Sequence, residues 1–172
     1  RPNSGPNHHV PGMRGTSIVA QAGRYLGDEA TPIVQDTWAN ISSAVETAAT
    51  AAQALIDCNG REAVYALMRP SGHHAMSDMG QGGCLLANTA IATQRLTHRW
   101  PKIAVLDIDV HHGNGTQQIF YERDDVLTVS IHGNPEVLFP FVSGYADERG
   151  SDAGEGYNLN IPRYIDSSAT AE

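Results

Sequence analysis

The densest group of chemically useful side chains is DIDVHHG, over residues 107–113, which directly follows an apolar run. Side chains alternate along an extended chain, so Asp107, Asp109 and His111 are expected on one side of it. A carboxylate and a neutral imidazole suit Zn²⁺, and a catalytic zinc ion needs one further protein ligand and an open position for water. We therefore expect Asp109 and His111 to bind one zinc ion. The alternative is a solvated strand end, which is disfavoured because burying two carboxylates without a cation is costly.

A second group is the adjacent pair His73 and His74, in the sequence RPSGHHA over residues 69–75. Two imidazoles in a glycine-containing loop can both face one site, where one acts as general base on a metal-bound water and the other holds or donates a proton. Such a pair is weak evidence by itself, because His8 and His9 form another one in a segment with the composition of a plain loop. His73 and His74 follow an expected buried strand and are accompanied by a distant Asp-x-His sequence, which favours a catalytic role.

Two further residues are placed to support these groups. A carboxylate or amide that is hydrogen-bonded to a catalytic histidine fixes its tautomer and raises its basicity. We expect Asp107 to support His73 in this way, and Asn114, directly after Gly113, to support His74 more weakly.

The segments between these groups have the pattern of helices and buried strands. A long helix is expected over residues 32–57, with Thr31 as its N-cap and an apolar stripe at three- and four-residue spacing. Continuous apolar runs predict buried strands over residues 63–68, 103–108 and 126–131.

A glycine-rich loop over residues 69–83, a helix over 85–100 and a short helical segment over 115–122 connect the expected strands. This order predicts an α/β fold with a parallel sheet and helices on its faces. Ligands bind at the carboxyl ends of the strands in such sheets, and both groups of reactive side chains fall there.

Composition favours one globular domain over residues 1–172, with an irregular arm over residues 1–15. The hydrophobic fraction of 41% and the charged fraction of 17% argue against disorder and coiled coil. No apolar run approaches the roughly 18 residues that cross a bilayer, and the N-terminus lacks the apolar stretch of a signal peptide, so we expect a cytoplasmic protein with no membrane partner.

The net charge of −8 argues against a nucleic-acid-binding surface and is compatible with a cationic small-molecule substrate. Cys58 and Cys84 are too few and too far apart for a disulfide framework or a thiolate zinc site.

The two motifs resemble those of the zinc-dependent histone deacetylases and the bacterial acetylpolyamine amidohydrolases. RPSGHHA is similar to the paired-histidine motif of that family, and DIDVHHGNGT, over residues 107–116, is similar to its metal-binding motif. Three later stretches are most similar to the amidohydrolase branch, and they cover residues 120–135, 139–140 and 144–148. The similarity runs from about residue 31 to residue 162.

The resemblance implies an arginase/deacetylase-like fold, with a parallel β-sheet flanked by helices and incomplete at both ends. It implies that Asp109 and His111 bind zinc, with one Zn²⁺ per complete site. It also implies that His73 and His74 activate water and protonate the leaving amine.

A structural potassium ion (K⁺) is implied as well, held by Asp107 and Ser130 with main-chain oxygens near Asp109, His111 and Ile131. Phe139 would form one wall of a substrate tunnel, whereas Gly83 stands where an aromatic wall is usual in the family. The family's second zinc-binding aspartate and its carbonyl-polarising tyrosine have no counterpart between residues 145 and 172.

We therefore expect hydrolysis of an acetylated amine, of the acetylpolyamine or acetyl-lysine type, to acetate and a free amine. The acidic charge and the amidohydrolase-like stretches favour a small cationic amide over a histone tail, and the resemblance allows a homodimer. Three alternatives stay open. The chain could be a non-catalytic fragment or degenerate relative without the third zinc ligand and the catalytic tyrosine, or a pure binding module. It could also be a binuclear manganese hydrolase, which Gly113 disfavours because a further carboxylate is needed there.

Overall fold

The computed structural model describes residues 16–164, and the chain folds as two compact units, Arg1–Pro101 and Lys102–Glu172. The expected arm over residues 1–15, with the pair His8 and His9, lies outside the described residues. Over residues 16–164 there is no helix long and apolar enough to cross a membrane.

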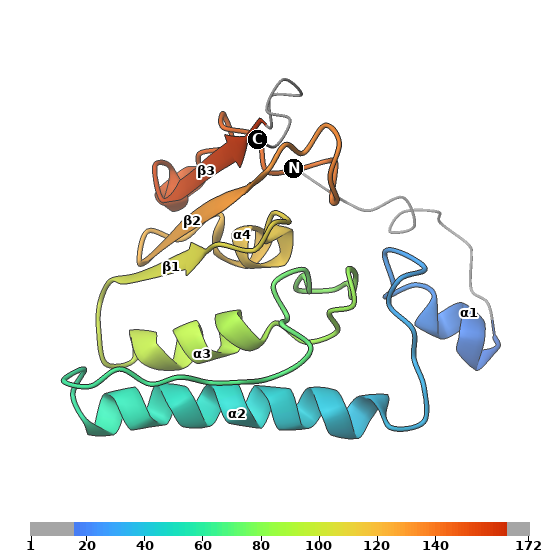
Figure 1. Cartoon of the computed structure of the whole chain (residues 1–172), viewed down its shortest axis with the longest axis horizontal. Coiled ribbons are helices and arrows are strands. Elements are labelled where there is room, and N and C mark those ends of the chain that lie inside the picture. The colour runs from blue at the N-terminus through green and yellow to red at the C-terminus, as the bar shows by residue number, and fades with distance from the viewer. Residues whose placement is uncertain (1–15, 165–172) are drawn as a thin grey trace, which may run out of the picture. The chain divides into compact units, whose positions relative to one another are not determined.

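Two helices that lie side by side form the first unit, α2 (Thr37–Asp57) and α3 (Asn88–Thr97) (Figure 1). A short helix, α1 (Ile18–Ala22), precedes them, and the Ser17 hydroxyl caps it by accepting the Ala20 amide at 3.1 Å. The expected apolar stripe on α2 is confirmed at Ile41, Ala48 and Ala52, whereas Trp38, expected at its start, is 72% exposed. Its buried members, at three- and four-residue spacing, are Ile41, Ala44, Ala48 and Ala52.

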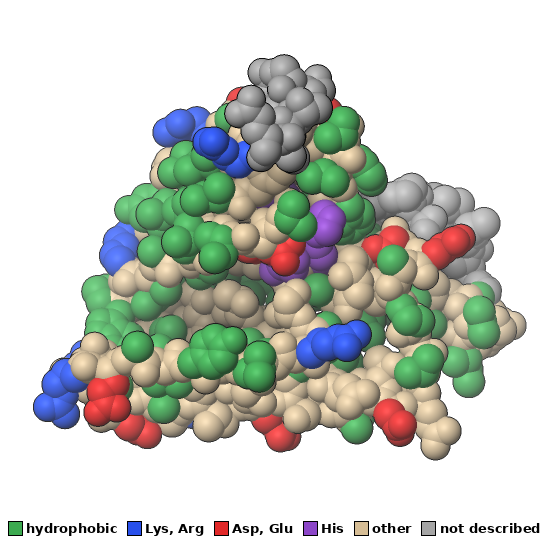
Figure 2. Space-filling view, viewed as in Figure 1, with side chains coloured by type: hydrophobic (Ala, Val, Ile, Leu, Met, Phe, Trp, Pro, Cys, Tyr) green, Lys and Arg blue, Asp and Glu red, His purple; other side chains and the backbone are tan. Residues whose placement is uncertain are grey.

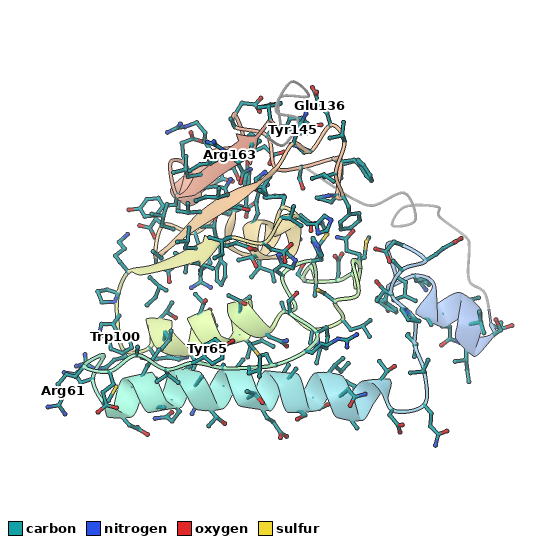
Figure 3. All side chains as sticks on the ribbon, viewed as in Figure 1. Arg61, Tyr65, Trp100, Glu136, Tyr145 and Arg163 are labelled. Carbon is teal, nitrogen blue, oxygen red and sulfur yellow. The ribbon has the colours of Figure 1, made fainter. Side chains whose placement is uncertain are left out.

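The long helix begins at Thr37 and not at residue 32, so the predicted start is wrong. Thr31 is not its N-cap, because the Thr31 hydroxyl is hydrogen-bonded to Asp28 and to the Gly83 amide. The predicted end is confirmed. Asn59 and Gly60 have φ angles of 55° and 68°, which are not helical, so the helix cannot continue through them. Arg61 and Trp100 lie near this end of α2 (Figure 3). The second helix is shorter than its predicted range of residues 85–100.

Residues 63–68 do not form the predicted strand. They run extended along α2 (Figure 1), and Tyr65 and Leu67 are 85% and 80% exposed. The length and apolar composition of the run are typical of a buried strand. A strand also needs a neighbouring strand that supplies hydrogen bonds, however. Within residues 16–164 no strand pairs with this segment.

A parallel sheet forms the second unit, with strands β1 (Ile103–Asp107), β2 (Val126–Gly133) and β3 (Asn158–Arg163) in the order β1-β2-β3. The helix α4 (Asn114–Phe120) lies between β1 and β2 in sequence, and a 3-10 turn, η1 (Asp152–Gly154), precedes β3. The parallel sheet, its first two strands and the short helix are confirmed, whereas β3 was not predicted. The register pairs Asp107 with Ser130, and Ser130 with Asn160.

The two faces of this sheet differ in exposure. Toward α4, Val126 and Phe120 are buried beside polar strand residues. On the opposite face Leu106, Ile131 and Leu159 are exposed, and Figure 2 shows hydrophobic side chains over the strands of this unit. The prediction that the strand over residues 103–108 is buried is therefore wrong, because within the described part of this unit α4 covers one face only.

The exposure of the two faces predicts the cost of truncating a side chain on each. Phe120→Ala is expected to lower the free energy of unfolding by about 3–5 kcal/mol, because Phe120 is 2% exposed. Leu106→Ala is expected to cost less than about 1 kcal/mol, because Leu106 is 62% exposed. Urea unfolding followed by circular dichroism measures both losses, and equal losses would contradict the assignment of the exposed face.

Candidate functional site

His73 and His74 occupy the centre of a tight turn in the first unit. The Ala75 amide closes the turn on the Gly72 carbonyl at 3.1 Å. Gly72 has a φ angle of 92°, and a Cβ atom there would fall 2.6 Å from the Asn88 amide nitrogen, so the turn requires glycine. Both imidazoles are buried, with ring centroids 3.9 Å apart. The turn therefore holds the two predicted catalytic rings against each other.

Two buried side chains fix the segment that leads into this turn. The Gly72 amide donates to the Cys84 sulfur at 3.2 Å. The Asn88 side-chain amide donates to the Pro70 carbonyl at 2.8 Å and to the Ser71 carbonyl at 3.3 Å. Because Asn88 begins α3, the helix holds the histidine turn through its first residue.

Asp109 and His111 come together in the second unit, directly after β1. The strand ends at Asp107, whose carboxylate accepts the Asp109 amide at 3.0 Å, and the Asp109 carboxylate accepts the His111 amide at 2.8 Å. The chain is therefore bent here, and the prediction of an extended segment is wrong, because each aspartate accepts the amide two residues ahead. His111 Nδ1 lies 3.4 Å from Asp109 Oδ1, and both side chains are nearly half exposed.

The donor chemistry of this pair fits zinc, since one carboxylate oxygen and one imidazole nitrogen are both ordinary zinc ligands. Two donors are one fewer than a catalytic zinc site takes from the protein. Among residues 16–164, no group of three or more histidine, cysteine, aspartate or glutamate side chains is placed to hold a metal ion.

The predicted tunnel residues belong to different units. Phe139 lies beside His111, edge to face, with ring centroids 6.4 Å apart. Gly83 has a φ angle of 75°, and a Cβ atom added there would meet nothing within 4 Å. Asn114, predicted to support His74, is the buried first residue of α4.

A buried hydrogen-bond network joins the sheet to the loop over residues 134–148. The Gln117 side-chain oxygen accepts from His112 at 3.0 Å, from Asn158 at 2.9 Å and from Asn160 at 2.8 Å. The Gln117 amide donates to the Glu148 carboxylate at 2.8 Å. One glutamine therefore connects α4, β3 and the loop.

The Glu148 carboxylate and His132 hold the same loop through Gly144. The Gly144 amide donates to Glu148 at 2.8 Å. His132 Nε2 lies 2.8 Å from the Gly144 carbonyl, which only accepts, so this nitrogen carries the proton. In the neutral ring Nδ1 then accepts from the Ser130 hydroxyl at 2.8 Å. The Ser130 hydroxyl uses its one hydrogen in that bond.

None of the network residues His112, Gln117, His132 and Glu148 was predicted from the sequence. A signal was present in the alternating polar residues of β2, where Thr128, Ser130 and His132 share the face toward α4. Such alternation ordinarily predicts that the polar side faces solvent, so the sequence does not show that α4 buries this face and that every group on it needs a partner.

Comparison with known proteins identifies relatives for nearly the whole chain. The family described as the histone deacetylase domain matches residues 5–170. An acetylpolyamine amidohydrolase of Burkholderia pseudomallei is 49% identical over 154 residues, which are 90% of this chain and 45% of that protein. Acetylpolyamine amidohydrolase 1 of Pseudomonas aeruginosa is 49% identical over 148 residues, covering 86% of this chain and 42% of that protein.

Solved structures agree with the sequence comparison. The crystal structure of an acetylpolyamine aminohydrolase from Burkholderia pseudomallei matches 91% of this chain, with a TM-score of 0.86 and 47% identity. A histone deacetylase homologue from Aquifex aeolicus matches 81% of this chain, with a TM-score of 0.68 and 31% identity. The chain spans 45% of the first structure and 37% of the second, so it corresponds to less than half of each. The predicted α/β fold is confirmed.

The network predicts a strong effect from one buried amide. Gln117→Leu removes the acceptor that His112, Asn158 and Asn160 share. Asn160 keeps acceptors at Tyr145 and Glu148, whereas Asn158 keeps only the Glu148 carbonyl for its two hydrogens. Because each buried donor that loses its acceptor costs about 1–3 kcal/mol, we expect the unfolding free energy to fall by at least about 2 kcal/mol, and the Gly144 amide to exchange faster with solvent. Gln35→Leu, which makes the same change at an exposed glutamine of the first unit, is the matched control. Similar small losses for both variants in urea unfolding would contradict the network.

Proposed function

Because this chain belongs to the histone deacetylase domain family, we propose that the protein hydrolyses an acetylated amine to acetate and a free amine in a zinc-dependent reaction. The observation that best supports this proposal is the distance of 3.4 Å between Asp109 Oδ1 and His111 Nδ1. Both residues lie in the motif where the family resemblance implies two zinc ligands. The family match covers residues 5–170, so it includes this motif and the histidine turn of the other unit. We take the two units to be parts of one deacetylase domain.

Asp109 and His111 would hold the zinc ion. When bound, zinc supplies a Lewis acid that polarises the substrate carbonyl and makes water acidic enough to attack it. We assign to His73 and His74 the two proton movements of the reaction. One imidazole, in its neutral form, would take a proton from the attacking water, and the other, in its protonated form, would deliver a proton to the leaving amine nitrogen. Burial of both rings in one turn supports this assignment, because it fixes their orientation.

The supporting residues have assigned roles in the same proposal. Asp107 would orient His73, and Asn114 would orient His74. Asp107 and Ser130 line one small cavity of about 10 Å³, which is the space of a single water molecule or small ion. A hydroxyl oxygen and a carboxylate are suitable ligands for a cation, so we assign the structural K⁺ to Ser130 and Asp107, together with main-chain oxygens near Asp109, His111 and Ile131.

An acetylated polyamine is the substrate class that we propose. The relatives from Burkholderia pseudomallei and Pseudomonas aeruginosa carry the name acetylpolyamine amidohydrolase, and they are 49% identical to this chain. The net charge of −8 supports a cationic substrate, because an acidic protein raises the local concentration of cations. The walls of the substrate tunnel are assigned to Phe139 and to the residues around Gly83. A homodimer stays a prediction.

Substitutions of the proposed ligands and of the histidines should separate metal binding from proton transfer. Asp109→Asn and His111→Ala are expected to weaken zinc binding more than about a hundredfold, because loss of a ligand exceeds the effect of losing a residue that merely supports one. His73→Ala and His74→Ala are expected to retain zinc and to lower kcat by about 10²–10⁴-fold.

Elemental analysis of zinc per chain tests the metal ligands. Acetate release, measured on the same preparation, tests the two histidines. Asp147→Asn, which changes an exposed aspartate of the second unit, is the control. Unchanged zinc affinity in Asp109→Asn would contradict the assignment of the metal ligands.

Substrate charge gives a separate test. The monoacetylated form of a diamine is expected to have a kcat/KM at least about tenfold higher than an N-acetyl alkylamine of equal length, and the advantage should shrink as salt rises. Acetate release at low and high ionic strength measures both quantities. Equal values for the two substrates would exclude the cationic substrate class while leaving the amide hydrolysis intact.

A further inference from the structure

A two-residue turn lies against the histidine pair in the first unit. Main-chain hydrogen bonds join Gln81 and Cys84 in both directions, at 2.9 and 2.8 Å. The two central residues, Gly82 and Gly83, have φ angles of 56° and 75°, as a type I′ turn requires. Such a turn does not use the amides of its central residues, so both amides need acceptors from elsewhere.

Asp28 and Thr31 supply these acceptors from a segment about fifty residues earlier in the chain. The Gly82 amide donates to one carboxylate oxygen of Asp28 at 2.5 Å. The Gly83 amide donates to the Thr31 hydroxyl at 2.9 Å, and that hydroxyl donates to the other Asp28 oxygen at 2.8 Å. One carboxylate therefore holds both amides, one directly and one through the buried Thr31, and hydrogen bonds to a charged acceptor are the stronger kind.

The segment that carries Asp28 is itself fixed to the turn. The Gly27 amide donates to the Gly80 carbonyl at 2.8 Å, and the Gly80 amide donates to the Tyr25 carbonyl at 2.7 Å. The Asp28 carboxylate also accepts the Ala30 amide at 3.0 Å. Main-chain pairing and side-chain bonds thus act on the same stretch, which limits how far the turn can move.

The turn contacts His74 through the α-carbon of Gly82. A Cβ atom at Gly82 would overlap the imidazole at Cδ2 and would lie 2.7 Å from Cγ, so the glycine backbone lies directly on the ring. We propose that Asp28, acting with Thr31 through the Gly82–Gly83 turn, is a positioning residue for His74. The inference rests on the proposed catalytic role of His74, and it goes beyond that role because it assigns a function to a carboxylate outside the reacting groups.

The test combines kinetics with a direct signal from the ring. Asp28→Ala is expected to lower kcat at least about tenfold with less than about a twofold change in KM, because misplacing a catalytic group slows chemistry more than binding. The same variant should shift the His74 ring signals in the NMR spectrum of histidine-labelled protein. Thr31→Val is expected to act in the same direction, whereas Thr31→Ser keeps the hydroxyl and should behave like the wild type. Glu29→Ala, at the exposed neighbouring carboxylate, is the control.

Each outcome decides for or against the positioning role. An Asp28→Ala variant that raises KM with unchanged kcat, or that leaves the His74 signals in place, would overturn it, because the carboxylate would then act on substrate or not at all. If Asp28→Ala does not fold, the contrast between Thr31→Val and Thr31→Ser decides in the same way. If the wild-type protein releases no acetate but the ring signals still shift, the positioning stands and the proposed function fails.

Discussion

The requirement that buried polar groups be hydrogen-bonded governs the second unit. The sheet face toward α4 carries buried polar residues on β2 and β3. A group left unpaired there would lower the free energy of unfolding, because burying a polar group without a hydrogen bond is costly. Gln117 and Glu148 meet this requirement, and in doing so they tie the loop after β2 to the sheet. Figure 3 shows Tyr145 on this loop, where its hydroxyl donates to the Phe141 carbonyl at 2.9 Å. The network therefore also holds the loop on which Phe139 lies beside His111.

Carboxylates that accept main-chain amides shape both groups of proposed site residues. In the second unit, Asp107 and Asp109 bend the chain after β1 and bring the two proposed zinc ligands together. In the first unit, Asp28 holds the glycine turn that lies on His74. The same kind of bond thus places a metal ligand in one unit and a proposed proton-transfer group in the other. Hydrogen bonds within and between short turns thus set much of the geometry of these side chains.

The sequence was informative where a residue's role is local and uninformative where it depends on a distant partner. The apolar run before Asp107 predicted β1, and the glycine-rich loop with its two histidines was confirmed as a loop. Residues 63–68 have an equally good apolar run, but a strand depends on a neighbour that such a run cannot specify. Thr31 fits an N-cap by type, yet its hydroxyl is bonded to Asp28 and to Gly83, fifty-two residues ahead. β3 was missed because NLNIPR is half polar, and its buried asparagines depend on distant acceptors in Gln117, Tyr145 and Glu148.

The proposed function requires that a carboxylate and a single histidine of this chain, Asp109 and His111, bind the zinc ion of a deacetylase. X-ray absorption at the zinc edge, on the zinc-loaded protein, tests these two ligands most directly. We predict a first shell of nitrogen and oxygen atoms at about 2.0–2.2 Å, with the signature of one imidazole, which is lost in His111→Ala. A sulfur shell at about 2.3 Å, or an imidazole signature that survives that substitution, would contradict the account.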